Sequence, residues 1–211
     1  MPTTGADRPV LFESERLRFH RIDPVDAAEV DATCQDWESV RYTSSIPHPY
    51  PAGEALRFIE SAVDKWDADT FWLMAARRKS DGIYVGQLGL TPDPDTHGQA
   101  ELSYLLARPV WGQGYGTEMA RAGVRYGFTV RNLSNIFARV FLENEPSNRL
   151  CQRIGMRFRH VGVVDAFARD RMVDVNFYDL SRADWDAAEA TTGAAAGATT
   201  GATGATGAIG A

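Results

Sequence analysis

The spacing of apolar residues predicts alternating helices and strands up to about residue 180. Residues 51–65 carry Leu56, Ile59 and Val63 at intervals of three and four, the spacing of an amphipathic helix. A similar pattern through Met119 and Tyr126 predicts another helix, and short alternating or continuously apolar runs predict strands. Further helices are expected at residues 24–34, 38–42 and 147–153, and strands at residues 16–22, 71–77, 84–90, 100–106, 136–142, 158–164 and 173–180.

The order of these elements predicts an α/β fold with a mixed sheet flanked by helices. Helices come early, a hairpin-rich middle follows, and the last part alternates strand and helix. Ligands of such open sheets bind beyond the carboxyl ends of strands, where neighbouring strands diverge. We expect one domain at residues 10–190 after a flexible segment at residues 1–9. Residues 191–211, almost entirely Gly, Ala and Thr, predict a disordered tail because they bury too little apolar surface to offset the entropy of ordering.

Composition and charge narrow the classes of function. The 211 residues carry a formal net charge of -6, which argues against a nucleic-acid binder but allows a cationic partner such as an amine. No apolar run reaches the roughly 18 residues of a membrane span, and no signal-peptide pattern opens the chain, so a cytoplasmic location is expected. The two cysteines, Cys34 and Cys151, indicate no disulfide framework, and four scattered histidines indicate no metal site.

The most informative stretch is residues 111–118, with the sequence WGQGYGTE, between a predicted strand and a predicted helix. Glycine allows close backbone approach, and a helix N-terminus presents unpaired N–H groups to an anion, so this stretch predicts a phosphate cradle. A dinucleotide fingerprint is excluded because Thr117 stands where the last glycine belongs and no acidic residue follows at the required distance. A nucleotide P-loop is excluded because no lysine follows Lys79.

The stretch resembles instead the pyrophosphate loop of the GCN5-related N-acetyltransferases (GNAT), in particular their ribosomal-protein N-terminal acetyltransferase branch, similar to RimJ and RimL. Three other stretches, in the expected order, are similar to further signatures of that branch: residues 11–17 (LFESERL), 46–50 (IPHPY) and 144–156 (NEPSNRLCQRIGM). The resemblance spans residues 10–180. It implies a single-domain GNAT fold, whose mostly antiparallel mixed sheet splays apart between strands four and five, here residues 100–106 and 136–142.

The resemblance also implies acetyl-CoA as acetyl donor and assigns residues to its binding. The loop would hold the pyrophosphate through backbone N–H groups, Asn144 would hydrogen-bond the pantetheine, and an N–H near Leu105 or Leu106 would stabilise the oxyanion. The cofactor-binding residues expected in the loop are Gly112, Gln113, Gly114, Gly116 and Thr117. Gly123 and Gly127, inside the helix, are expected to pack against the sheet.

Two side chains are expected to carry the chemistry. The amine is mostly protonated at neutral pH, so a base is needed, and Glu101 at the start of strand four is the first candidate, directly or through a water, with Glu143 as the second. Ser147 resembles the branch's proton donor to the departing thiolate, although a serine at a helix start is also a typical N-cap. Aromatic residues in the segments that border the family's acceptor site are Trp37, Tyr42, Trp72 and Phe167.

The resemblance favours a protein N-terminal α-amine as acceptor. A small-molecule amine, such as a polyamine, an amino acid or an antibiotic, is the alternative enzyme substrate. A regulatory module that binds acyl-CoA without turnover is the alternative of another class. Family members occur as monomers and homodimers, and neither state is indicated by the sequence.

Overall fold

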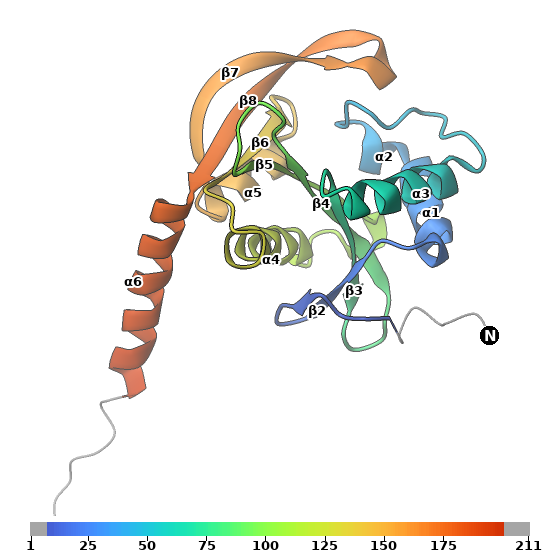
Figure 1. The fold of residues 1–211 in the computed structure, drawn as a ribbon. Coiled ribbons are helices and arrows are strands. Elements are labelled where there is room, and N and C mark those ends of the chain that lie inside the picture. Colours follow the sequence, from blue (N-terminus) through green and yellow to red (C-terminus); the bar gives the residue numbers. More distant parts are fainter. Residues whose placement is uncertain (1–7, 201–211) are drawn as a thin grey trace, which may run out of the picture.

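The computed structural model describes residues 8–200, and the side chains up to residue 191. One sheet of eight strands runs through the molecule in the order β1-β2-β3-β4-β5-β6-β8-β7 (Figure 1). The strands are β1 Phe12–Glu13, β2 Leu17–Arg21, β3 Trp72–Arg78, β4 Tyr84–Pro92, β5 Gln99–Leu106, β6 Asn135–Phe141, β7 Arg157–Ala166 and β8 Arg171–Ser181. The helices are α1 Ala27–Gln35, α2 Trp37–Val40, α3 Glu54–Asp67, α4 Tyr115–Thr129, α5 Glu145–Arg153 and α6 Arg182–Thr200, with short 3-10 turns at Pro24–Asp26, Arg108–Val110 and Phe167–Arg169.

Every strand pair is antiparallel except β5 with β6. The parallel ladder between β5 and β6 covers only three pairs and ends at Glu101 opposite Phe137. Beyond that point the two strands no longer pair with each other, although β5 continues to Leu106 alongside β4 and β6 continues to Phe141 alongside β8. The sheet is therefore open between these strands at their carboxyl ends, and the predicted α/β fold with a splayed mixed sheet is confirmed.

Helices cover both faces of the sheet. One core cluster lies on the α4 side and includes Leu88, Met119 and Phe128, while a second lies on the α1 and α3 side and includes Ile59 and Leu73. Figure 1 shows α4 on one side of the strands and α1 to α3 on the other. The alternation of side chains along β5 divides its residues between the two clusters, so each face of the open strand has its own surroundings.

Two glycines let α4 approach the sheet closely. A Cβ on Gly123 would lie 2.6 Å from a methyl carbon of Leu88, and one on Gly127 would lie 2.7 Å from Ile136 Cδ1. Because a real Cβ does not fit at these distances, the expectation that both glycines serve packing is confirmed.

The structure differs from the sequence expectations mainly near the ends of elements. α5 begins at Glu145 rather than at residue 147, and the helix expected at residues 38–42 is the shorter α2. The predicted tail starts inside α6, which extends away from the sheet and continues to Thr200 (Figure 1). Residues 191–200 are therefore helical. Residues 201–211 lie outside the described part of the chain. Within the described residues, no helix is both long and apolar enough to cross a membrane.

Candidate active site

The opening between β5 and β6 exposes backbone groups of β5. Ala107 N–H donates to Val85 O of the neighbouring strand β4 at 3.0 Å. Because N–H directions alternate along a strand, Leu105 N–H also faces β4, whereas Leu106 N–H faces the opening. Leu106 O, on that same side, accepts from Trp111 Nε1 at 3.1 Å. Of the two residues expected to supply an oxyanion donor, Leu106 has the suitably directed amide.

The glycine-rich loop joins this strand to α4. Gly112 and Gly114 have φ of +75° and +81°, left-handed values that glycine adopts without steric cost, and Gly114 is the residue that precedes the helix. The first N–H groups of α4 have no partner within the helix, so the loop and the first turn present donors from Gln113 to Thr117. A helix dipole adds a partial positive charge at the same point, which suits a phosphate.

An ion pair anchors this helix start to the N-terminal part of the chain. The Glu118 carboxylate accepts hydrogen bonds from Ser14 Oγ, Arg16 N and Arg16 Nε, each at 2.7 Å. Burial alone would raise the pKa of Glu118, but these hydrogen bonds outweigh it and hold the pKa below its usual value. Arg16 also donates to Gln113 O at 3.0 Å and lies over the Tyr115 ring, 4.2 Å from its centre. The guanidinium therefore sits beside the predicted phosphate cradle.

A second arginine approaches the loop from α5. Arg153 Nη1 donates to Thr117 Oγ1 at 3.3 Å, and Arg121 of α4 donates to Arg153 O at 3.0 Å. Two guanidinium groups, those of Arg16 and Arg153, therefore contact the loop and the first turn of α4, and Arg121 contacts the end of α5. Sequence reasoning did not identify them, because their positions near the loop depend on packing between separate elements.

Ser147 of α5 meets Tyr104 of β5 at the opening of the sheet. The two hydroxyl oxygens lie 2.8 Å apart. Burial raises the pKa of Tyr104 well above its ordinary value, and burial likewise raises the pKa of the neighbouring Cys151 thiol to about 11. The result is a small group of neutral hydroxyl and thiol donors beside the position expected for the cofactor thiol. Tyr104 was not identified from the sequence.

The N-cap of α5 is Asn144, and Ser147 is the third residue of that helix. Asn144 Oδ1 accepts from Ser147 N at 3.2 Å. The alternative interpretation of Ser147 as an N-cap is therefore wrong, because the helix begins two residues before it. Asn144 lies at the end of β6 with its oxygen engaged in this cap, and its expected contact with pantetheine stays a prediction.

Glu101 lies at the last position where β5 pairs with β6, next to Arg139 of β6. Arg139 Nε donates to Glu101 Oε1 at 3.0 Å and Arg139 Nη2 donates to Oε2, so both carboxylate oxygens are engaged. This hydrogen bonding raises the pKa of Arg139. Glu101 is held in an ion pair at the closed end of the opening, and its role as base stays a prediction.

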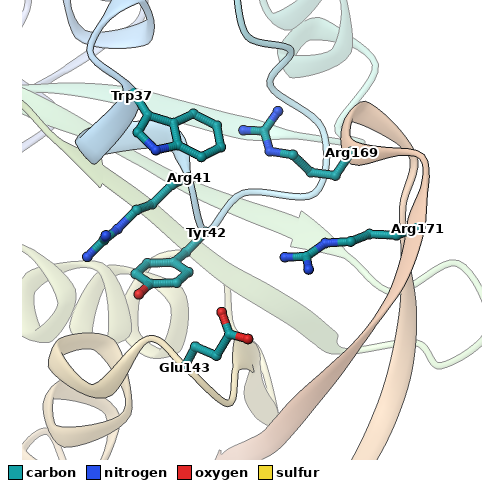
Figure 2. Close-up of a pocket in the computed structure, with 6 residues that line it drawn as sticks. All are labelled: Trp37, Arg41, Tyr42, Glu143, Arg169 and Arg171. Carbon is teal, nitrogen blue, oxygen red and sulfur yellow. The ribbon is translucent and has the colours of Figure 1, made fainter.

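Glu143 instead lines a pocket at the open end (Figure 2). The pocket has a volume of about 400 Å³, is open to solvent, and is lined by Trp37, Arg41, Tyr42, Glu143, Arg169 and Arg171. Tyr42 contacts Phe141, the last residue of β6, with ring centres 6.4 Å apart. The pocket therefore adjoins the carboxyl end of the splayed strand.

Two distant parts of the chain frame this pocket. Ala168 N–H donates to Ser44 O at 3.0 Å, and Arg169 Nη2 donates to Val40 O at 2.8 Å, so the turn between β7 and β8 is bound to the end of α2 and to the segment after it. Among the aromatic residues expected at an acceptor site, Trp37 and Tyr42 line the pocket. Trp72 does not, because it is buried in the core and its Nε1 donates to Asp69.

The comparisons with known proteins agree with this geometry. Residues 16–157 match the family model described as an acetyltransferase (GNAT) domain. The chain is 28% identical over 179 residues to the uncharacterized N-acetyltransferase p20 of Bacillus licheniformis, covering 82% of this chain and 96% of that protein. It is 31% identical over 159 residues to the spermidine N(1)-acetyltransferase of Escherichia coli K12, covering 74% of this chain and 75% of that protein.

Solved structures show the same fold. RimL, described as a ribosomal L7/L12 alpha-N-protein acetyltransferase in complex with coenzyme A, superposes with a TM-score of 0.71 at 13% identity, covering 82% of this chain and 98% of that one. At that identity the likeness concerns the fold alone. The family model covers well over half of the chain and includes the splayed strands and the glycine-rich loop, so this protein belongs to the GNAT acetyltransferases, enzymes that take their acetyl group from acetyl-CoA.

Proposed function

We propose that this enzyme acetylates the primary α-amine of a protein or peptide N-terminus by direct attack on the acetyl-CoA thioester. The observation that carries the proposal is the solvent-open pocket of about 400 Å³ beside the open end of the splayed strands, with one carboxylate, Glu143, on its wall. An open pocket accommodates a chain end that continues into solvent. RimL, which shares the fold, is described as an alpha-N-protein acetyltransferase.

In the proposed mechanism, the loop from Gly112 to Thr117 holds the pyrophosphate, assisted by Arg16 and Arg153. Leu106 N–H receives the oxyanion of the tetrahedral intermediate. Glu143, directly or through a water, removes a proton from the attacking amine. Ser147, supported by Tyr104, donates to the departing thiolate. Holding amine and thioester together supplies a large part of the rate, because it removes the entropy cost of their encounter.

A small-molecule amine is the second candidate acceptor. The 31% identity with the spermidine N(1)-acetyltransferase of Escherichia coli favours it. The charge of the pocket does not favour a polyamine, since three of its six lining residues are arginines.

The proposal is tested by two measurements on the purified protein. Calorimetric titration with acetyl-CoA reports donor binding, and release of free CoA in the presence of N-terminal peptides, amino acids and polyamines reports transfer. Binding with transfer to peptides is the expected result. Binding without transfer to any amine would support a non-catalytic acyl-CoA sensor instead.

The choice between the two candidate bases is a separate prediction. Glu143→Gln should lower kcat/KM by about 100-fold at neutral pH, because general base catalysis typically contributes that much or more. Glu101→Gln should cost less, since Glu101 is occupied by Arg139. Glu145→Gln is the matched control, because Glu145 is a nearby exposed carboxylate that pairs with Arg149. A larger loss for Glu101→Gln than for Glu143→Gln would return the role of base to Glu101.

A further inference from the structure

The pocket at the open end of the sheet carries an excess of positive charge. Three of its lining residues are arginines and one is acidic. Arg41 is ion-paired with Glu38 at 3.3 Å, so its charge is balanced within the protein. The other two arginines, Arg169 and Arg171, come from the turn between β7 and β8 and the start of β8. They account for the excess.

Within the part of the chain that the structure describes, neither Arg169 nor Arg171 forms a salt bridge. Among the described residues, Arg169 donates only to the carbonyls of Val40 and Ala168, at 2.8 and 3.2 Å, and its guanidinium lies 5.1 Å from the centre of the Trp37 ring. Its Nε is buried and has no acceptor in the part of the chain that the structure describes. The Arg171 side chain extends from the hairpin toward the centre of the pocket (Figure 2).

Two like charges are thus held near each other beside an open pocket. Burial lowers the pKa of Arg169, and the positive charge of Arg171 lowers it further. Repulsion between these two charges costs free energy, and an anion placed between the two groups would relieve it. Guanidinium groups bind carboxylates and phosphates through paired, charge-assisted hydrogen bonds, which makes these two classes of anion the suitable ligands.

On the basis of the proposed function, we propose that the acceptor carries an anionic group, a carboxylate or a phosphate, which binds to Arg169 and Arg171 while its amine lies at Glu143. The carboxylate of Glu143 enters the pocket from the loop after β6, on a different wall from the two arginines (Figure 2). Trp37 and Tyr42 add aromatic surface to the lining of the same pocket. A polyamine would place a second cation against the arginines and is therefore disfavoured.

The experiment compares kcat/KM for matched acceptors that differ in the anionic group. The pairs are β-alanine with β-alaninamide, phosphoethanolamine with ethanolamine, and a peptide whose second and third residues are Asp with the same peptide carrying Asn. Spermidine is the cationic probe. The anionic member of at least one pair should be favoured by about 10- to 100-fold, the range expected for hydrogen bonds to charged groups. The favoured pair identifies the source of the anion: amino acid, aminoalkyl phosphate or acidic peptide.

Reversing the charge of Arg171 distinguishes recognition of the acceptor's anionic group from a general structural effect on activity. Arg171→Glu should reverse the preference, so that spermidine or the neutral member of each pair becomes the better acceptor by about 10-fold or more. Arg157→Gln is the matched control, because Arg157 lies on the same hairpin and pairs with Asp184 rather than lining the pocket. The control should leave the preference ratio unchanged. A structural effect of Arg171→Glu would lower all acceptors equally and leave the ratio unchanged as well.

The outcomes distinguish this inference from the proposed function. Acetyl transfer with no preference for anionic acceptors, or with a preference for spermidine, overturns the inference and leaves the transferase in place. Tight binding of acetyl-CoA without transfer to any of these amines overturns both. An unchanged ratio in Arg171→Glu also overturns the inference.

Discussion

The hydroxyl groups of Tyr104 and Ser147 form one hydrogen-bonded pair beside the opening of the sheet, 2.8 Å apart. Tyr104 belongs to β5 and Ser147 to α5, and the neighbouring Cys151 thiol completes the group. Because burial raises the pKa of Tyr104 well above its ordinary value, the phenol stays protonated through neutral and mildly alkaline pH. Tyr104 can therefore donate to Ser147 while Ser147 donates elsewhere, so we assign Tyr104 a positioning role.

Tyr104→Phe tests this role, since it removes one hydroxyl and keeps the ring. Turnover should fall by about 10-fold, the effect of losing one hydrogen bond, whereas Ser147→Ala should lower it by about 100-fold. Because Tyr104 acts through Ser147, the double variant should be no slower than Ser147→Ala alone. Kinetics of CoA release give the rates, and calorimetry should show unchanged affinity for acetyl-CoA. Losses that simply multiply would mean that the two hydroxyls act independently.

At the scale of elements, the predicted binding of acetyl-CoA depends most on the glycine-rich loop at residues 111–114 together with the first turn of α4. Glu118 ties this turn to Ser14 and Arg16, and Arg16 in turn lies against Gln113 and Tyr115. The anchor joins residues that are far apart along the chain and brings a guanidinium to a row of N–H donors. The anion binding that we predict for this unit would thus depend on its backbone shape, its dipole and one long-range ion pair.

Gly114→Asp should weaken acetyl-CoA binding by about 100-fold or more, because it places a negative charge beside the phosphates, where repulsion costs several kcal/mol. The new Cβ would lie 3.5 Å from Arg16 Nη2, so the carboxylate would also compete with phosphate for that guanidinium. Gly82→Asp is the control, since Gly82 has a similar φ of +74° in the turn between β3 and β4 and its substitution meets no atom within 4 Å. Calorimetry measures both variants. Equal affinity in the two would contradict the assignment of the loop to phosphate.

Both cysteines are buried in the folded protein. Their burial predicts that the folded protein loses stability at alkaline pH. Burial raises the pKa of Cys34 to about 12 and that of Cys151 to about 11, from an ordinary value of 9.0. Above pH 9 the unfolded chain loses these protons while the folded chain keeps them, so the unfolded state binds fewer protons. The free energy of unfolding should therefore be highest below pH 9 and should fall as the pH rises toward 11.

This decrease is measured by urea unfolding between pH 7 and 10.5. Between the two pKa values of a thiol, only the unfolded chain has lost the proton. In that range the free energy of unfolding falls by about 1.4 kcal/mol for each pH unit, so the loss should reach the order of 2 kcal/mol per thiol. Buried tyrosines with raised pKa values, such as Tyr104, add a decrease of the same sign at the upper end. Cys151→Ala should show a shallower slope. A free energy of unfolding that stays constant from pH 8 to 10 would contradict the burial of the thiols.

Local patterns in the sequence were enough to establish the type and order of most elements, the glycine-rich loop and the family. Apolar spacing sets helices and strands, and glycine with a following helix forms an anion cradle within a few residues, so none of these features needs distant contacts. The ends of elements were less certain. Asparagine and serine both favour the N-cap position, so the sequence alone could not choose between Asn144 and Ser147. In the fold, Asn144 is the residue that caps α5.

Which side chains meet at the site depended on the three-dimensional packing alone. The fold paired Glu101 with Arg139 across β5 and β6, brought Tyr104 to Ser147, and placed Arg16 beside the loop. It also assembled the pocket from segments near residues 37–42, 143 and 169–171, which are tied together by hydrogen bonds such as that of Arg169 with Val40. Strand register and packing between elements determine these contacts. Neither can be predicted from the spacing of residues along the chain.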